Sequence, residues 1–153
     1  MKKITVLLVA MLFVFGAFAQ KINDKDVPKG IMDDFNNKYP TAEKVMWSKI
    51  DKRTVAEFKH DGDNARAEYE NNYWQCVYWS VPEDACPYKI KEYIKEYYKG
   101  LVIIKTDILQ TNTNENSYVI TIGKKKKKAT TELYFETTGS FKKKVDLTPE
   151  VKK

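Results

Sequence analysis

The largest concentration of charged groups in the sequence is a run of five lysines, Lys124 to Lys128. Together with Lys142 to Lys144, the run could form a positive edge for an acidic glycan, a lipid headgroup or another anion. The alternative is a solvated hairpin tip, because lysines on turns and edge strands keep sheets from pairing with their neighbours. Salt separates the two interpretations, since screening weakens binding by exposed charges.

Two cysteines, Cys76 and Cys86, are the other residues with distinctive chemistry. An oxidising compartment favours a disulfide between them over two free thiols. Closing a loop of about ten residues would stabilise the fold by about 2–3 kcal/mol. The pair lacks the Cys-x-x-Cys spacing that tunes a redox-active thiolate. We therefore predict a structural Cys76–Cys86 disulfide.

The sequence gives little support for a catalytic or a metal-binding site. The single histidine, His60, is accompanied by no Gly-x-Ser-x-Gly elbow and no reactive-cysteine signature. Asp61-Gly62-Asp63-Asn64 offers oxygen ligands but not the spaced ladder and closing glutamate of a calcium loop. Glu132 and Glu136 are four residues apart in a strand, where they form two exposed acids on one face. We predict a protein that is not an enzyme, with no cofactor and no metal site.

The N-terminus has the pattern of a secretory signal peptide. Two lysines precede an apolar run from Ile4 to Phe15, and Ala17-Phe18-Ala19 supplies the small residues that signal peptidase reads. Residues 1–19 are expected to be removed between Ala19 and Gln20, which leaves 25 basic and 21 acidic residues and a net charge of +4. The mature protein is then periplasmic or secreted, with no integral membrane span and no access to nucleic acid.

The rest of the chain divides into two similar halves. Residues 27–80 and 81–147 each begin with a Val-Pro pair, after a lead over 20–26 and before a tail over 148–153. Apolar residues at helical spacing predict helices over 28–39 and over about fourteen residues from 88, the second ending at Gly100. Alternating and β-branched runs predict eight strands, over 44–50, 54–60, 65–70, 73–80, 101–109, 118–122, 130–136 and 141–145.

Several of these core and turn residues occur in a recognisable order: Val27-Pro28, Phe35, Tyr39-Pro40, Val45-x-Trp47, Ala56-x-Phe58, Ala67-x-Tyr69-Glu70 and Tyr73-Trp74. The order resembles the β-lactamase-inhibitor-like, PepSY-like family of exported bacterial proteins over residues 26–147. The resemblance implies an α+β, BLIP-like fold, a tandem pseudo-repeat of a helix plus a four-stranded antiparallel meander. Both helices would cover one face of a shared sheet. It also implies binding without catalysis. Asn71-Asn72 stands where the family usually has a glycine.

Aromatic residues are the stronger lead to a binding surface, because they make up 13% of the chain and exceed what a core of this size hides. If Cys76 is bridged to Cys86 at the start of the second helix, strand alternation turns Trp74, Cys76 and Tyr78 toward the helices. Alternation leaves Trp47 open to either face. We predict a protein-binding patch on the open face, for another envelope or secreted protein, formed by Tyr73, Gln75, Val77 and Trp79. A basic hairpin of Lys124, Lys125, Lys126, Lys127 and Lys128 that binds an anionic envelope polymer or small ligand is the alternative.

Overall fold

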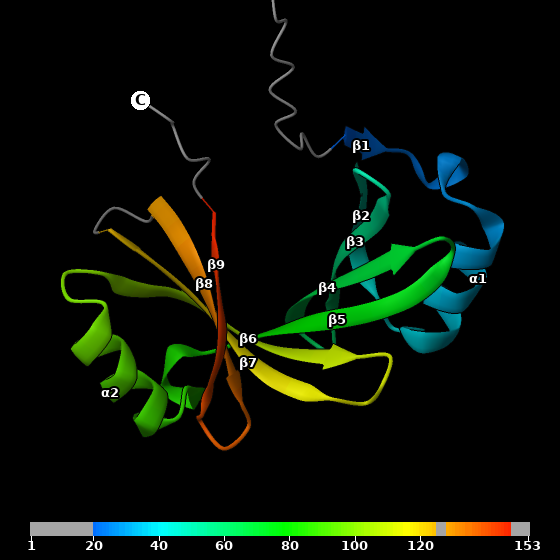
Figure 1. Ribbon diagram of the computed structural model, residues 1–153. Coiled ribbons are helices and arrows are strands. Elements are labelled where there is room, and N and C mark those ends of the chain that lie inside the picture. Colours follow the sequence, from blue (N-terminus) through cyan, green and yellow to red (C-terminus); the bar gives the residue numbers. More distant parts are fainter. Residues whose placement is uncertain (1–19, 125–127, 148–153) are drawn as a thin grey trace, which may run out of the picture.

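The computed structural model of the protein describes residues 20–124 and 128–147 (Figure 1). The predicted signal peptide, the centre of the lysine run and the predicted tail lie outside these ranges. The chain forms β1 (Gln20–Ile22), α1 (Lys29–Lys38), β2 (Glu43–Ile50), β3 (Arg53–His60), β4 (Asp63–Glu70), β5 (Tyr73–Val81), α2 (Tyr88–Tyr97), β6 (Val102–Thr111), β7 (Asn116–Lys124), β8 (Lys128–Glu136) and β9 (Phe141–Asp146). Two 3₁₀ turns, Asp24–Asp26 and Glu83–Ala85, lead into the helices.

All nine strands belong to one antiparallel sheet in which each strand pairs with its neighbours in the chain, in the order β1 to β9. The strand β1 was not predicted, because three residues are too few to show an alternating pattern; it pairs with β2 through Lys21 and Ser48. Short turns join the strands, several of them at residues with positive φ such as Asp51, Asp61 and Asn72. Asn and Asp tolerate this left-handed region better than other non-glycine residues.

The helix α1 buries Ile31 and Phe35, which are four residues apart and share one face. The ring of Phe35 lies 5.0 Å from Trp47 and 4.9 Å from Phe58, both in edge-to-face contact, and 5.2 Å from Tyr39. Aromatic pairs in this arrangement add stability beyond the area that they bury. These rings form the centre of a core cluster between α1 and strands β2 to β5.

The helix α2 buries Ile90 and Ile94 against apolar residues of β7 and β8, among them Ile120 and Leu133. It is shorter than predicted, with ten residues, the same length as α1. Tyr98 leaves the helical region at φ −124° and ψ 51°, so the chain turns out of the helix before it reaches Gly100. Neither helix has the length and apolarity needed to cross a membrane, which holds for the described part of the chain.

The predicted disulfide is wrong: Cys76 and Cys86 are free thiols in two different clusters. Cys86 follows a 3₁₀ turn and precedes the N-cap proline of α2, the place that Val27 holds before α1. Both residues are buried, Val27 to 6% exposure and Cys86 to 3%. Cys86 therefore serves as a small apolar core residue, a common role of unbridged cysteine.

The aromatic contacts of Phe35 predict a large loss of stability on truncation. Phe35→Ala should lower the free energy of unfolding in urea by about 3–5 kcal/mol, because it leaves a cavity among three rings. Tyr97→Ala is the control, since Tyr97 is 62% exposed, and should change it by less than about 0.5 kcal/mol. Equal effects of the two substitutions would contradict this packing.

The free thiols predict that reductant leaves the melting temperature of the mature protein unchanged. Burial raises the pKa of the Cys76 thiol to about 11 from 9.0. Its thiolate fraction at pH 8 is then about 100-fold lower than that of an ordinary thiol, and iodoacetamide should alkylate Cys76 at least that much more slowly. Thermal unfolding with and without reductant checks the first expectation, and mass spectrometry of the alkylated, unreduced protein checks the second. A mass 2 Da below that of the dithiol, with a melting temperature that falls in reductant, would contradict the structure.

Candidate binding face of the sheet

One face of the sheet carries a row of cross-strand neighbours that runs from β2 to β6. The row is Met46, Glu57, Arg66, Tyr78 and Leu109. The next positions along the strands, Trp47, Ala56, Ala67 and Val77, form a parallel row in the core cluster that includes α1. Because successive side chains of a strand point to opposite faces, the first row faces away from α1. We call this surface, with Tyr73, Lys105, Asp107, Val119, Glu132 and Tyr134, the Arg66 face.

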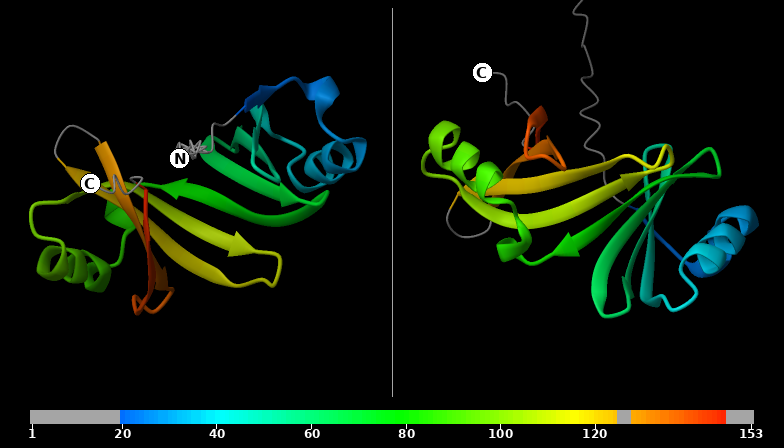
Figure 2. Two further views of the ribbon diagram at one scale, coloured as in Figure 1. Left: turned by 45° about the horizontal axis from the view of Figure 1, so that its top comes forward. Right: turned by 90° about the horizontal axis from the view of Figure 1, so that it is seen from below.

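The sheet bends so strongly that distant strands meet across the Arg66 face. Tyr78 of β5 and Tyr134 of β8 belong to one buried cluster with Val119. Strands three positions apart in a flat sheet are about 14 Å apart, too far for such packing. Figures 1 and 2 show this bend: β2 to β4 and β8 to β9 rise on two sides of β5 to β7, with α1 and α2 on the outer flanks.

A buried carboxylate lies in the middle of the Arg66 face. The Glu68 side chain is 8% exposed, accepts a hydrogen bond from Arg53 at 2.8 Å through Oε2 and forms an ion pair with Arg66 at 3.2 Å through Oε1. A buried charge is tolerated only when it is paired and hydrogen-bonded. The two arginines come from β3 and β4, so this pairing also fixes the positions of their side chains.

Besides pairing with Glu68, Arg66 stacks on the ring of Tyr78. Its guanidinium carbon lies 4.2 Å from the centre of the Tyr78 ring, a cation–π contact, and its Nε is buried without a hydrogen-bond partner. Burial lowers the pKa of Arg66, but the opposing effects of Glu68, Tyr78 and Glu132 are larger together and raise it. Glu132 lies in β8, four strands from β4, so its effect on the pKa of Arg66 also depends on the bend.

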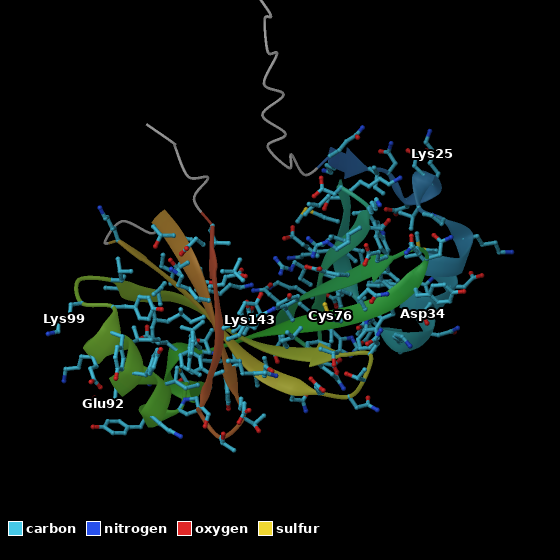
Figure 3. The ribbon with its side chains drawn as sticks, viewed as in Figure 1. Lys25, Asp34, Cys76, Glu92, Lys99 and Lys143 are labelled. Carbon is cyan, nitrogen blue, oxygen red and sulfur yellow. The ribbon has the colours of Figure 1, made fainter. Side chains whose placement is uncertain are left out.

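Tyrosines occupy the centre of the bend. Burial raises the pKa of Tyr78 to about 12. Tyr134 donates a hydrogen bond to Glu132 Oε2 at 3.0 Å, and Lys143 lies 4.5 Å from the centre of the Tyr134 ring. Figure 3 labels Lys143 and Cys76 near the middle of the molecule, while Glu92 of α2 lies on an outer flank. The centre of the face is thus a network of partnered charges and rings.

A hollow of about 370 Å³ opens on the same face, across strands β2 to β6. A second buried carboxylate lies beside it: Asp107 is 4% exposed, accepts from Ser80 Oγ at 2.7 Å and pairs with Lys105 at 3.0 Å. The side chains and backbone that line the hollow belong to Lys44, Met46, Glu57, Phe58, Lys59, Asn64, Ala65, Arg66, Ser80 and Lys105. Most of its polar groups are cationic.

Two of the four residues predicted to share the open face lie on the α1 side of the sheet instead. Val77 is 1% exposed and belongs to the core under α1, and the ring of Trp79 lies 6.0 Å from that of Tyr39 in the same cluster. The predicted orientation of these two residues is therefore wrong. It rested on a disulfide that would have turned Cys76 toward the helices; Cys76 instead packs with Tyr78 on the Arg66 face.

A β-bulge accounts for the rest of the pattern. Glu68 pairs with Cys76 and Tyr69 with Trp74, so Gln75 has no opposed residue and the alternation of β5 reverses across it. Tyr73 pairs with Glu70, lies on the Arg66 face and is 73% exposed. Trp74 lies on the α1 side and donates to the Tyr39 hydroxyl at 3.0 Å.

The remaining predicted positions are as follows. Trp47, which alternation left open, lies on the α1 side and is 2% exposed. Lys124 is exposed and its backbone pairs with that of Lys128, while Lys125, Lys126 and Lys127 lie outside the described residues. His60 packs against Trp79, with ring centres 5.7 Å apart, and its Nδ1 is 2.9 Å from Thr41 Oγ1. No group of His, Cys, Asp or Glu within 20–124 and 128–147 is arranged to hold a metal ion.

Sequence reasoning missed Arg66, Glu68, Tyr78 and Asp107 as parts of a buried network. The alternation of Arg66, Glu68 and Glu70 with apolar residues is typical of a strand with one solvated face. Burial of Glu68 comes from Arg53 on the neighbouring strand and from the bend, and neither leaves a local pattern. A charged pair two residues apart in the middle of a strand is the only signal that the sequence offers.

Solved structures with this architecture provide a comparison. A DUF2874 family protein from Bacteroides uniformis matches with a TM-score of 0.67 and 18% identity, over 79% of this chain and 90% of that one. A BLIP-like protein from Bacteroides fragilis matches with a TM-score of 0.62 and 21% identity, over 80% and 87%. A protein described among "putative periplasmic proteins" from Bacteroides eggerthii matches with a TM-score of 0.66 and 20% identity, over 80% and 90%. At these identities the likeness shows the fold alone.

No curated protein shows significant similarity to the chain. A family model described as "Putative beta-lactamase-inhibitor-like, PepSY-like" matches residues 52–143, which include strands β3 to β8, α2 and most of the Arg66 face. The match spans more than half of the sequence. The chain therefore belongs to the β-lactamase-inhibitor-like, PepSY-like family.

Proposed function

We propose that the protein is an exported binding protein that catalyses no reaction and holds another protein on the Arg66 face. The observation that carries the proposal is the bend, which turns this face into a concave surface with a fixed network of charges and rings. The inhibitor-like description of the family supports a binding role. The partner is an envelope or secreted protein.

Export rests on the N-terminal sequence. Two lysines, an apolar run and Ala17-Phe18-Ala19 have the pattern of a cleaved signal peptide. One protein of similar fold is described as periplasmic, which supports the same compartment. We infer that the mature chain begins at Gln20 and acts in the periplasm or outside the cell.

The Arg66 face suits protein recognition because its charged groups are positioned before a partner arrives. Binding costs less when side chains need not be ordered on association. Met46 and Tyr73 are exposed on this face, to 52% and 73%, and supply apolar area for a partner to cover. Lysines and glutamates around them would set orientation and association rate more than affinity.

We further infer that the chain is a tandem duplication with both helices on one face of the sheet. Residues at an offset of 59 hold matching places: Val27 and Cys86 are buried, Pro28 and Pro87 are N-caps, and Ile31 and Ile90 face the core. Ala65, Trp79, Ile108 and Tyr118 are successive cross-strand neighbours that extend from the α1 cluster to the α2 cluster. Such a duplication leaves the opposite face without a covering helix.

The basic hairpin, Lys124 to Lys128, remains the second candidate. It would hold an anionic envelope polymer or a small ligand, and five consecutive lysines are the observation that favours it. Its binding would depend on salt and would be insensitive to substitutions on the Arg66 face. These differences allow one experiment to separate the two candidates.

The proposal predicts that Met46→Asp combined with Tyr73→Ala lowers capture of the partner at least tenfold, because the pair removes apolar contact area and adds a charge to the concave face. The mature chain, 20–153, is immobilised and exposed to a bacterial envelope extract in 0.1 M and 0.5 M NaCl. Retained proteins are identified and quantified by mass spectrometry. One partner should be retained at both salt concentrations.

Tyr88→Ala is the matched control, since Tyr88 on α2 is 75% exposed. It should leave capture unchanged. Lys125→Gln, Lys126→Gln and Lys127→Gln in one variant test the hairpin. Capture that ignores the double substitution but disappears in this lysine variant and in 0.5 M NaCl would overturn the proposal in favour of the hairpin.

A further inference from the structure

We propose that the hollow on the Arg66 face receives an acidic segment of a protein partner, one that carries a carboxylate next to an apolar side chain. This inference rests on the proposed function and names the chemistry of the partner. It does not involve the lysine run. It follows from the charges, the apolar surface and the backbone of the hollow.

The charges that line the hollow are mainly positive. Three lysines, Lys44, Lys59 and Lys105, and one arginine, Arg66, are opposed by the single carboxylate of Glu57. The four cations come from strands β2, β3, β4 and β6 and so surround the hollow instead of following one strand. Such a ring attracts a negative group and repels a positive one.

These cations differ in their present partners. Lys105 is paired with Asp107 and Arg66 with Glu68. In the described part of the chain, Lys44 and Lys59 form no ion pair within 4.0 Å. Their charges are therefore free to meet an incoming carboxylate without breaking an existing contact, and Glu57 is the one lining group that opposes it.

Arg66 contributes a charge whose position is fixed. Its Nε is buried and has no hydrogen-bond partner. Because that atom has no exposed surface, Arg66 acts on a ligand in the hollow through its charge and not through this donor. The stacking on Tyr78 and the pairing with Glu68 keep the side chain in place while it binds.

The apolar part of the hollow favours a peptide over a simple anion. Met46 supplies the apolar side chain of the hollow and is 52% exposed. Phe58 and Ala65 line it only from behind, since their side chains lie in the core cluster under α1. An inorganic anion would leave this surface wet, whereas a segment with an acid and an adjacent apolar side chain covers it. A peptide segment also agrees with the proposed function, in which the Arg66 face binds a protein.

The backbone at Lys44 gives an independent indication of a built site. Its φ is +53°, in the left-handed region, and the pairing of β2 with β3 is shifted between Glu43 and Met46. Bulges of this kind redirect side chains and are frequent beside functional sites. Here the irregularity includes Lys44 and adjoins Met46, and both residues line the hollow.

The test is a titration of ¹⁵N-labelled mature protein, followed through its backbone amide signals. The probes are a blocked tetrapeptide of alternating glutamate and leucine, its glutamine counterpart, and glutarate as a free dicarboxylate. The acidic peptide should shift the amides of Lys59, Arg66 and Ser80. Lys44→Gln combined with Lys59→Gln should weaken its binding about tenfold, since two charges are lost.

Lys49→Gln combined with Lys52→Gln is the matched control, because it removes two exposed lysines of the same hairpin outside the hollow. It should reduce affinity less than twofold. Equal binding of the glutamine peptide, equal binding of glutarate, or no shift at the hollow would each overturn the inference. None of these results depends on capture from the envelope extract, so the proposed function would stand or fall separately.

Discussion

The packing of Tyr78 against Val119 and Tyr134 is the interaction on which the rest of the structure depends. It joins strands that a flat sheet would hold about 14 Å apart, and so it fixes the bend. Without the bend, Glu132 in β8 would lie too far from Arg66 of β4 to raise its pKa.

Buried charge is the second consequence of this geometry. Glu68 and Asp107 lie on the Arg66 face, which α1 does not cover, yet both are buried. Each is compensated by a neighbouring cation, Arg53 and Arg66 for Glu68 and Lys105 for Asp107. Buried ion pairs contribute little net stability but penalise alternative pairings. We therefore infer that these ion pairs determine the shape of the surface more than the stability of the fold.

Periodicity was sufficient to predict α1 and the eight longer strands, because apolar spacing reports local burial. Phe35, Ala67 and Tyr69 lie in the core as their patterns indicate. It could not predict β1, whose three residues are held by pairing with β2, nor the early end of α2 at Tyr97. Both depend on backbone geometry that composition does not encode.

The candidate site was harder to predict because one residue reverses a strand. The bulge at Gln75 turned Val77 and Trp79 to the α1 side, while Tyr73 stayed on the Arg66 face. The assumed disulfide gave the wrong phase to the strand after Gln75, although Cys86 in the place of Val27 indicates a core residue. Register over a bulge is set by partners across the sheet and is not visible in one strand alone.

The central claim is that the Arg66 face is covered when the protein binds its partner. Hydroxyl-radical footprinting of the complex measures this residue by residue, because methionine and tyrosine side chains react when they are exposed. Met46 and Tyr73 should lose most of their reactivity on binding, while Tyr88 and Tyr97 on α2 keep theirs. Protection of the two α2 tyrosines with Met46 and Tyr73 unchanged would contradict the account.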